Sequence, residues 1–158
     1  MKKFVMGVAA VGLCVSGLAA TQGLRAQGVA APTLKPDDII AVRQAGMALA
    51  GGFAETIKAG IASGADTKQY VEGAEALVKW ATAYMSLYPD GTQKGHDTKA
   101  KAEIWTDRAG FEKANAAFLA ASEKFVLAAK SGDKAAFADA WKAEGQSCGG
   151  CHRNYKEK

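Results

Sequence analysis

Four large apolar residues recur at intervals of seven in the second half of this chain, and this repeat constrains the fold more than any other feature. They are Ile104, Phe111, Phe118 and Phe125, and an alanine lies three residues after each of the last three. Large residues alternating with small ones at a spacing of seven are typical of the seam between helices that pack side by side. The segment 102–130 is therefore predicted to be one long helix of a bundle.

Three further segments show helical periodicity. They cover residues 36–62, 67–88 and 134–156. Pro36 suits a first helical turn, Pro89-Asp90-Gly91 ends the second segment, and Ser131-Gly132-Asp133 ends the third helix and caps the fourth. Alanine is abundant and the chain has only 3 prolines, which favours helices over sheets. The predicted fold class is all-α, an antiparallel four-helix bundle with one longer loop between the second and third helices.

The first residues have the pattern of a secretory signal peptide. Lys2 and Lys3 precede an uncharged apolar run, and small residues follow, so cleavage is expected near Ala20 or after Ala26. The run of about 17 residues is at the lower limit for a membrane span, which favours a signal over an anchor. We expect residues 1–26 to be removed, 27–35 to form a leader and 36–158 to form the folded domain, with no stable membrane anchor.

Removal of this signal changes the charge of the chain. Three of the 20 basic residues and none of the 16 acidic residues lie in 1–26, so the net charge falls from +4 to about +1. Nucleic-acid binding needs a concentrated basic face, and is not expected here. The sequence also lacks a phosphate-binding loop and a serine–histidine–acid pattern, so we do not expect an enzyme.

The residues Cys148-Gly149-Gly150-Cys151-His152 form the attachment motif of a c-type haem. A spacing of three residues on a helix brings both sulfurs to one side, where each can form a thioether with a haem vinyl group. His152 can then turn its imidazole onto the iron, and the two glycines leave room for the porphyrin edge. One covalent haem c and its iron are therefore the predicted cofactor, attached on the C-terminal helix.

Three other interpretations of the two cysteines fit the sequence less well. A disulfide is one, but it leaves the histidine unexplained. A structural zinc site needs four protein ligands, and the second histidine, His96, is far away in the sequence. A redox dithiol of the thioredoxin type belongs with a βαβ pattern, which this chain lacks.

The motif at the C-terminal end of a four-helix pattern resembles the class II cytochromes c, the cytochromes c-prime and their low-spin relatives. The resemblance covers residues 37–156. Its markers are Arg43-Gln44-Ala45-Gly46-Met47, Glu103-Ile104-Trp105-Thr106-Asp107 and Cys148 to Tyr155. It implies a four-helix bundle, a periplasmic location and a homodimer formed through the first two helices.

Met47 decides between two functions. The resemblance places it over the distal face of the haem, where a methionine ligates the iron in the low-spin relatives and only covers an open site in the five-coordinate proteins. From the residues alone, Met47 is either a core side chain or a ligand. We expect ligation, because only His96 could compete and because Leu87 to Gly91 resembles the low-spin relatives. The expected function is electron transfer with His152 and Met47 as axial ligands and with unidentified redox partner proteins. The alternative is a five-coordinate protein that binds NO or CO.

Several other polar and aromatic residues have a predicted place. Arg43 lies one turn before Met47, and a buried arginine is costly unless it is paired, so we expect it to bind a haem propionate or else to reach solvent. Lys156 lies either near the proximal haem face or in solvent. Trp105 and Trp141 are expected in the core, and His96 is expected in a surface loop.

Overall fold

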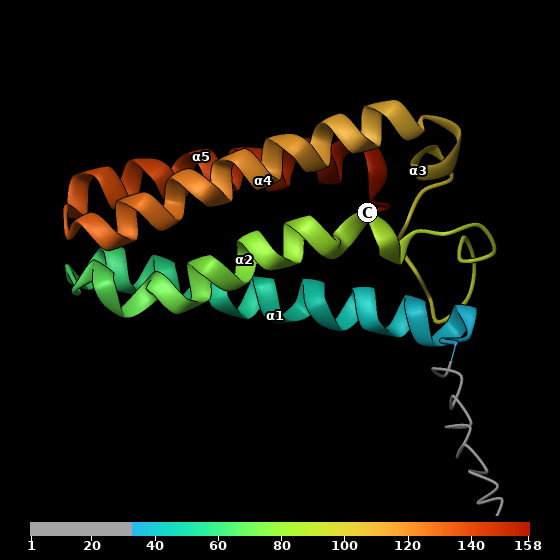
Figure 1. The fold of residues 1–158 in the computed structure, drawn as a ribbon, viewed down its shortest axis with the longest axis horizontal. Helices are drawn as coiled ribbons and strands as arrows, with labels where there is room; N and C mark the ends of the chain where they lie inside the picture. The colour runs from blue at the N-terminus through green and yellow to red at the C-terminus, as the bar shows by residue number, and fades with distance from the viewer. Residues whose placement is uncertain (1–32) are drawn as a thin grey trace, which may run out of the picture. The chain divides into compact units, whose positions relative to one another are not determined.

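The structure, a computed structural model, describes residues 33–158. The predicted signal peptide and most of the predicted leader lie outside the described residues. The helices are α1 (Pro36–Ser63), α2 (Val71–Tyr84), α3 (Glu103–Thr106), α4 (Arg108–Ser131) and α5 (Lys134–Tyr155). The four long helices run antiparallel in two layers, with α1 beside α2 and α4 beside α5 (Figure 1). The predicted fold class is therefore confirmed.

The predicted turn between the third and fourth helices is confirmed, and an acidic residue also caps the helical segment that follows α1. The carboxylate of Asp66 accepts a hydrogen bond from the Lys68 amide at 3.0 Å, and α1 is followed by a 3-10 helix at Thr67–Tyr70. Between α4 and α5, Gly132 adopts a left-handed conformation with φ of 79°, and the Asp133 carboxylate accepts from the amides of Ala135 and Ala136 at 2.9 and 3.0 Å. These bonds satisfy amides that the first turn of a helix leaves without partners.

The third predicted helix is not continuous, and the prediction was wrong at Asp107. This residue leaves the helical conformation with φ of −115° and ψ of 56°, which separates α3 from α4. One oxygen of its carboxylate accepts from the Gly110 amide at 3.1 Å, and the other accepts from the Tyr155 hydroxyl at 2.8 Å. Asp107 thus caps α4 and ties it to the last turn of α5. The second predicted helix, 67–88, is also shorter at both ends, because 3-10 helices at Thr67–Tyr70 and Met85–Leu87 flank α2.

Helices α1 and α2 approach each other closely where glycine faces an aromatic ring. A Cβ atom on Gly46 would lie 2.1 Å from the indole of Trp80, and one on Gly73 would lie 2.3 Å from the ring of Phe53. Neither position can carry a side chain in this packing. Gly46 directly precedes Met47, so this contact fixes the part of α1 that carries Met47.

The core consists of two clusters along the bundle. The first, which we name the closed cluster, lies toward the turns that join α1 to α2 and α4 to α5; its buried members are Ile57, Ala74, Leu77, Phe125, Ala129 and Phe137. The second, the tyrosine cluster, lies toward the other end; its buried members are Tyr84, Tyr88, Ile104, Phe111 and Tyr155. Met47 and Cys151 pack against the tyrosine cluster, so the haem motif belongs to this half of the bundle.

The segment between α2 and α3 is held at the same end of the bundle as the end of α5. The Lys101 amide donates to the Tyr155 carbonyl at 3.1 Å, and the Glu157 amide donates to the Lys99 carbonyl at 2.8 Å. These bonds form an isolated antiparallel bridge between Ala100 and Lys156. The residues that follow the haem motif are therefore anchored rather than free.

Within residues 33–158, none of the helices combines the length and the apolar character needed to cross a lipid bilayer.

Candidate haem site

The two cysteines and the histidine of the motif occupy the last two turns of α5. Cys148 and Cys151 are free thiols and half-buried, while His152 is exposed. A Cβ atom on Gly149 or Gly150 would come no closer than 3.5 Å to a side chain, that of Arg153. The backbone between the cysteines therefore has open space beside it, as a porphyrin edge requires.

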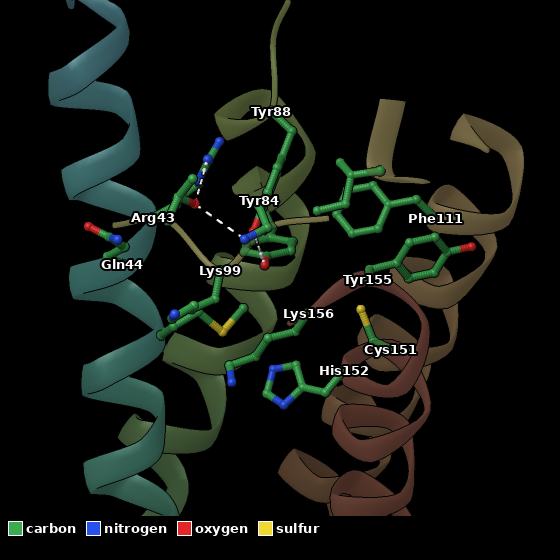
Figure 2. Close-up of a pocket in the computed structure, with 14 residues that line it drawn as sticks. Arg43, Gln44, Tyr84, Tyr88, Lys99, Phe111, Cys151, His152, Tyr155 and Lys156 are labelled. Atoms are coloured by element: carbon green, nitrogen blue, oxygen red, sulfur yellow. Dashed lines mark hydrogen bonds between the residues drawn. The ribbon is translucent and has the colours of Figure 1, made fainter. Parts of the chain in front are cut away.

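Two cavities adjoin the motif, with volumes of about 190 and 230 Å³. Both are lined by Cys151 and His152 from α5, by Met47 from α1 and by Tyr84 from α2. Figure 2 shows the first cavity, with Cys151 and His152 extending from α5 toward the side bordered by Arg43 and Tyr84. The second cavity also reaches Cys148, so both sulfurs and the imidazole border one hollow region between the two layers.

Desolvation shifts the pKa of all three groups. Neighbouring protein atoms partly desolvate the exposed His152 side chain and lower its pKa, and the nearby Lys156 lowers it further, which favours the neutral imidazole with a lone pair for a metal. Burial also raises the pKa of Cys151 to about 11, with Cys148 as the second cause. The pKa of Cys148 is raised by burial and then by the carboxylate of Glu144. Both sulfurs are therefore protonated thiols before they are modified.

The residues present fit a haem. The two cavities together fall within the range of ligand pockets, roughly 300–1,000 Å³, and their walls are mainly apolar and aromatic. Three buried polar atoms among the described residues have no hydrogen-bond partner, namely Trp80 Nε1, Asn115 Oδ1 and Glu144 Oε2. All three residues line the second cavity. Such atoms are rare in folded proteins, and their gathering around one cavity indicates a space that a bound group occupies.

Arg43 lies beside the first cavity, and its guanidinium is bound by the segment after α2. The side chain is 2% exposed. Its Nη1 donates to the Leu87 carbonyl at 3.3 Å and to Thr92 Oγ1 at 3.0 Å, and its Nη2 donates to the Thr92 carbonyl at 2.7 Å and to Thr98 Oγ1 at 3.0 Å. Burial lowers its pKa, and the nearby Tyr88 and Tyr84 oppose this. The expected alternative of an arginine that reaches solvent is thus wrong, because four neutral oxygens hold the charge inside.

The tyrosine hydroxyls at the site are engaged with other protein groups. The hydroxyls of Tyr84 and Tyr88 are paired with each other, and the Tyr155 hydroxyl donates to Asp107. The Tyr88 ring also lies under the Arg43 guanidinium, 4.7 Å from its centroid. Burial raises the pKa of both Tyr84 and Tyr88, so these groups stay neutral.

Glu144 is the site residue that the sequence analysis missed. It is fully buried in α5, and its Oε1 accepts a hydrogen bond from Ser122 Oγ of α4 at 2.8 Å. Phe137, Trp141, Cys148 and Tyr155 share its face of α5, and Glu144 continues their alternating spacing of four and three residues. An acidic residue at a seam position was therefore the signal that could have found it.

The remaining predicted residues lie as follows. His96 is exposed in the loop, as predicted, and lines neither of the two cavities. Lys156 lines the first cavity. Trp105 packs against the tyrosine cluster, and Trp141 packs against the closed cluster, which confirms both as core residues.

Comparison with known proteins agrees with this site. The profile of the cytochrome C' family matches residues 38–156. Cytochrome c' of Rubrivivax gelatinosus is 35% identical over 127 residues, which cover 78% of this chain and 98% of that protein. Its crystal structure superposes with a TM-score of 0.73 at 34% identity, covering 80% of this chain and 100% of that one.

Three further solved structures bear on ligands and assembly. A nitric oxide complex of a cytochrome c prime variant from Alcaligenes xylosoxidans has a TM-score of 0.72 at 28% identity, covering 80% of this chain and 99% of that one. A carbon monoxide complex of another variant of that protein matches equally well. A cytochrome c' described as having ligand-controlled dimer dissociation has a TM-score of 0.76 at 28% identity, covering 80% of this chain and 100% of that one.

These relatives correct the expected function. Electron transfer through an iron ligated by both His152 and Met47 was wrong, because the relatives that match nearly their full length are named cytochrome c' and structures of one of them hold NO or CO. A diatomic ligand needs a coordination position that a bound methionine would fill. The alternative, a five-coordinate haem with an open sixth position, agrees with the relatives.

Proposed function

Since this chain belongs to the cytochrome c' family, we propose that it is a periplasmic haem protein that binds NO or CO at an open sixth position of its iron. It binds one covalently attached haem c, whose iron supplies the site for the gas. In this proposal Cys148 and Cys151 form the two thioethers and the neutral His152 imidazole is the protein ligand of the iron.

The proposal rests on cytochrome c' structures that hold NO or CO, and one structural observation agrees with it: Met47 of α1 and His152 of α5 line the same two cavities from opposite layers of the bundle. A methionine facing the ligand histidine across the haem covers the sixth position. Its thioether is apolar, flexible and a weak acceptor, so it can yield to an entering gas and offers that gas no hydrogen bond.

The polar groups around the first cavity favour a neutral diatomic over a ligand that needs hydrogen bonds. Both terminal nitrogens of Arg43 donate hydrogen bonds to the segment after α2. The Gln44 amide donates to the His96 carbonyl at 2.8 Å, and the Tyr84 hydroxyl is paired with that of Tyr88. Polarity and donors in a distal pocket decide between ligand binding and activation. The three donors named above are already engaged, whereas Trp80 Nε1, which borders the second cavity, has no partner among the described residues.

Absorption spectra and CO binding test the proposal. The purified holoprotein should show broad high-spin bands in both oxidation states, and the ferrous form should bind CO. Met47→Ala should bind CO at least several-fold faster with an unchanged spin state, and Met47→Leu should stay close to the parent. Sharp low-spin bands that become high-spin in Met47→Ala would refute the proposal.

We also propose that the protein forms a homodimer, and we assign the dimer interface to the solvent-exposed face of α1. Val42 and Leu49 lie seven residues apart on this helix and are 43% and 76% exposed. Apolar side chains in such a row on a helix surface favour packing against a second copy. Sedimentation of the holoprotein should give a dimer, and Leu49→Glu should shift it to the monomer; a wild-type monomer at high concentration would refute this assignment.

A further inference from the structure

Glu144 is a buried acid beside the haem attachment point, with one carboxylate oxygen unsatisfied. Its side chain is fully buried, and within the described residues Oε2 has no hydrogen-bond partner. Glu144 lies one helical turn before Cys148, and both line the second cavity. A buried carboxylate is costly unless it is paired. Among residues 33–158 no cation pairs with this one, and Ser122 alone donates to it.

The neutral form of this acid fits its surroundings better than the ionised form. Ionised Glu144 would place a charge on the wall of a cavity that carries a second unsatisfied acceptor, Asn115 Oδ1. A proton on Oε2 would remove the charge and supply a donor. Consistent with this, burial raises the pKa of Glu144 to about 7, although the hydrogen bond from Ser122 opposes the shift. The carboxyl can therefore change protonation near neutral pH.

We propose that Glu144 is a proton-binding group coupled to the haem, which takes up a proton when the iron is reduced and releases it when the iron is oxidised. Glu144 gains its proton from water, forming one O–H bond at Oε2, as a one-electron donor supplies one electron to the iron. Reoxidation reverses both transfers. The physical cause is that the added electron makes the haem more negative, which disfavours a neighbouring carboxylate.

Other titratable groups on the cavity wall do not provide this coupling. The residues of α1 and α4 that line the second cavity carry no ionisable side chain. Tyr84 of α2 has its pKa raised far above neutrality by burial. On α5, Cys148 and Cys151 lose their protons permanently when they become thioethers, and His152 is held neutral on the iron. Glu144 is the group of this wall that remains free to titrate.

The size of the effect follows from electrostatics. One added charge at roughly 10 Å, in a medium of effective dielectric constant ~20, changes the proton affinity of an acid by about tenfold. A tenfold change corresponds to ~59 mV for one electron. The midpoint potential of the holoprotein should therefore fall by about this amount as the pH rises through the titration of Glu144.

The test is the midpoint potential of the holoprotein as a function of pH. The midpoint potential of wild type should fall as the pH rises through neutrality. Glu144→Gln keeps the shape of the side chain and the Ser122 contact, and its midpoint potential should not show this fall. Glu75→Gln is the matched control, since it removes the same charge from the outer surface of α2, where Glu75 pairs with Lys130. Its curve should parallel that of wild type. Parallel curves for Glu144→Gln and wild type would overturn the proposal.

A second variant and a direct readout keep the test decisive if Glu144→Gln does not load haem. Ser122→Ala removes the hydrogen bond that favours the ionised form, so the inflection of the potential should move to higher pH; an unmoved inflection counts against Glu144. Redox-difference infrared spectra of wild type should show the C=O stretch of a neutral carboxyl gained on reduction, and Ser122→Ala should shift that band. No such band would also overturn the proposal. The midpoint potential and the infrared band can be measured on any protein that has bound its haem, whether or not the iron binds NO or CO. A failure of this inference can therefore be distinguished from a failure of the proposed function.

Discussion

The closed cluster and the tyrosine cluster lie toward opposite ends of the same four helices, and they differ in what fills the space between the two layers. In the closed cluster the rings of Phe125 and Phe137 lie 4.8 Å apart between aliphatic side chains. In the tyrosine cluster, Phe111 packs edge-on against Tyr88 and Tyr155 at 5.0 and 5.1 Å, and the cavities open beside it.

The difference shows how one bundle combines stability with a binding site. Largely apolar packing around the closed cluster stabilises the fold, although its Leu77 and the adjoining Trp141 also border the second cavity. The tyrosine cluster can then tolerate cavities, a buried arginine and unsatisfied polar atoms, each of which is destabilising alone. Binding sites commonly occupy such less stable regions. Three substitutions test this division.

The largest effect is expected from Phe125→Ala in the closed cluster. Truncation of a fully buried phenylalanine typically costs about 3–5 kcal/mol, and denaturant unfolding of the holoprotein should show a loss of that size with an unchanged haem spectrum. Phe111→Ala is the matched variant two heptads earlier on α4. It should cost less, because it borders an existing cavity, and it should change the rate of CO binding. An equal cost with unchanged CO binding would contradict the division between the clusters.

The second effect concerns Glu144 and is pH-dependent. Its pKa is raised to about 7 by burial, above that of an exposed glutamate, so its stabilising contribution is complete at low pH and is lost as the pH rises through 7. Compared with Glu144→Gln, wild type should lose about 3 kcal/mol of unfolding free energy between pH 5 and pH 9.

Denaturant titrations of the ferric holoprotein at several pH values measure this difference. The matched variant Glu75→Gln should show a constant difference from wild type above pH 6, because the hydrogen bond from Lys130 lowers the pKa of Glu75 and its contribution is lost only in acid. A constant difference for Glu144→Gln would mean that Glu144 does not titrate in the folded protein.

The smallest of the three effects is expected from Arg43→Lys. Lysine keeps the charge but lacks the planar fork that reaches four oxygens at once, so we expect a loss of about 1–3 kcal/mol and faster amide exchange at Thr92 and Thr98. Arg108→Lys is the control, since Arg108 is more exposed and donates to the carbonyls of Met85 and Tyr88. Arg108→Lys should lower the free energy of unfolding by less than about 1 kcal/mol. Equal exchange rates in both variants would show that Arg43 does not hold the loop.

The helices and the haem motif could be predicted because their signals are local. The heptad repeat through Phe111 and Phe125 and the cap at Asp133 depend on residues a few positions apart. The partners of Arg43 could not be predicted, since Thr92 and Thr98 are 49 and 55 residues away in the sequence. Periodicity could show that Arg43 lies on the buried face, but not which oxygens a folded loop would bring to it.

Two other differences have a related origin. The break at Asp107 depends on a hydrogen bond from Tyr155, which is 48 residues away, while the apolar repeat continues through the break and conceals it. For Met47 the sequence allowed two roles, a ligand of the iron and a side chain that only covers the open sixth position. Both roles need the same residue on the same helix face. Its assignment depended on relatives rather than on local pattern.

The bridge between Ala100 and Lys156 has a practical consequence for anyone who expresses this chain with an added tag. The residues on either side of Lys156 are bonded to the loop, because the Tyr155 carbonyl accepts from the Lys101 amide and the Glu157 amide donates to the Lys99 carbonyl. An affinity tag joined directly after Lys158 would therefore begin next to a paired backbone and beside a wall of the first cavity. A tag at this end therefore needs a flexible spacer. A truncation that removes Lys156 would break the pairing between the loop and the last turn of α5.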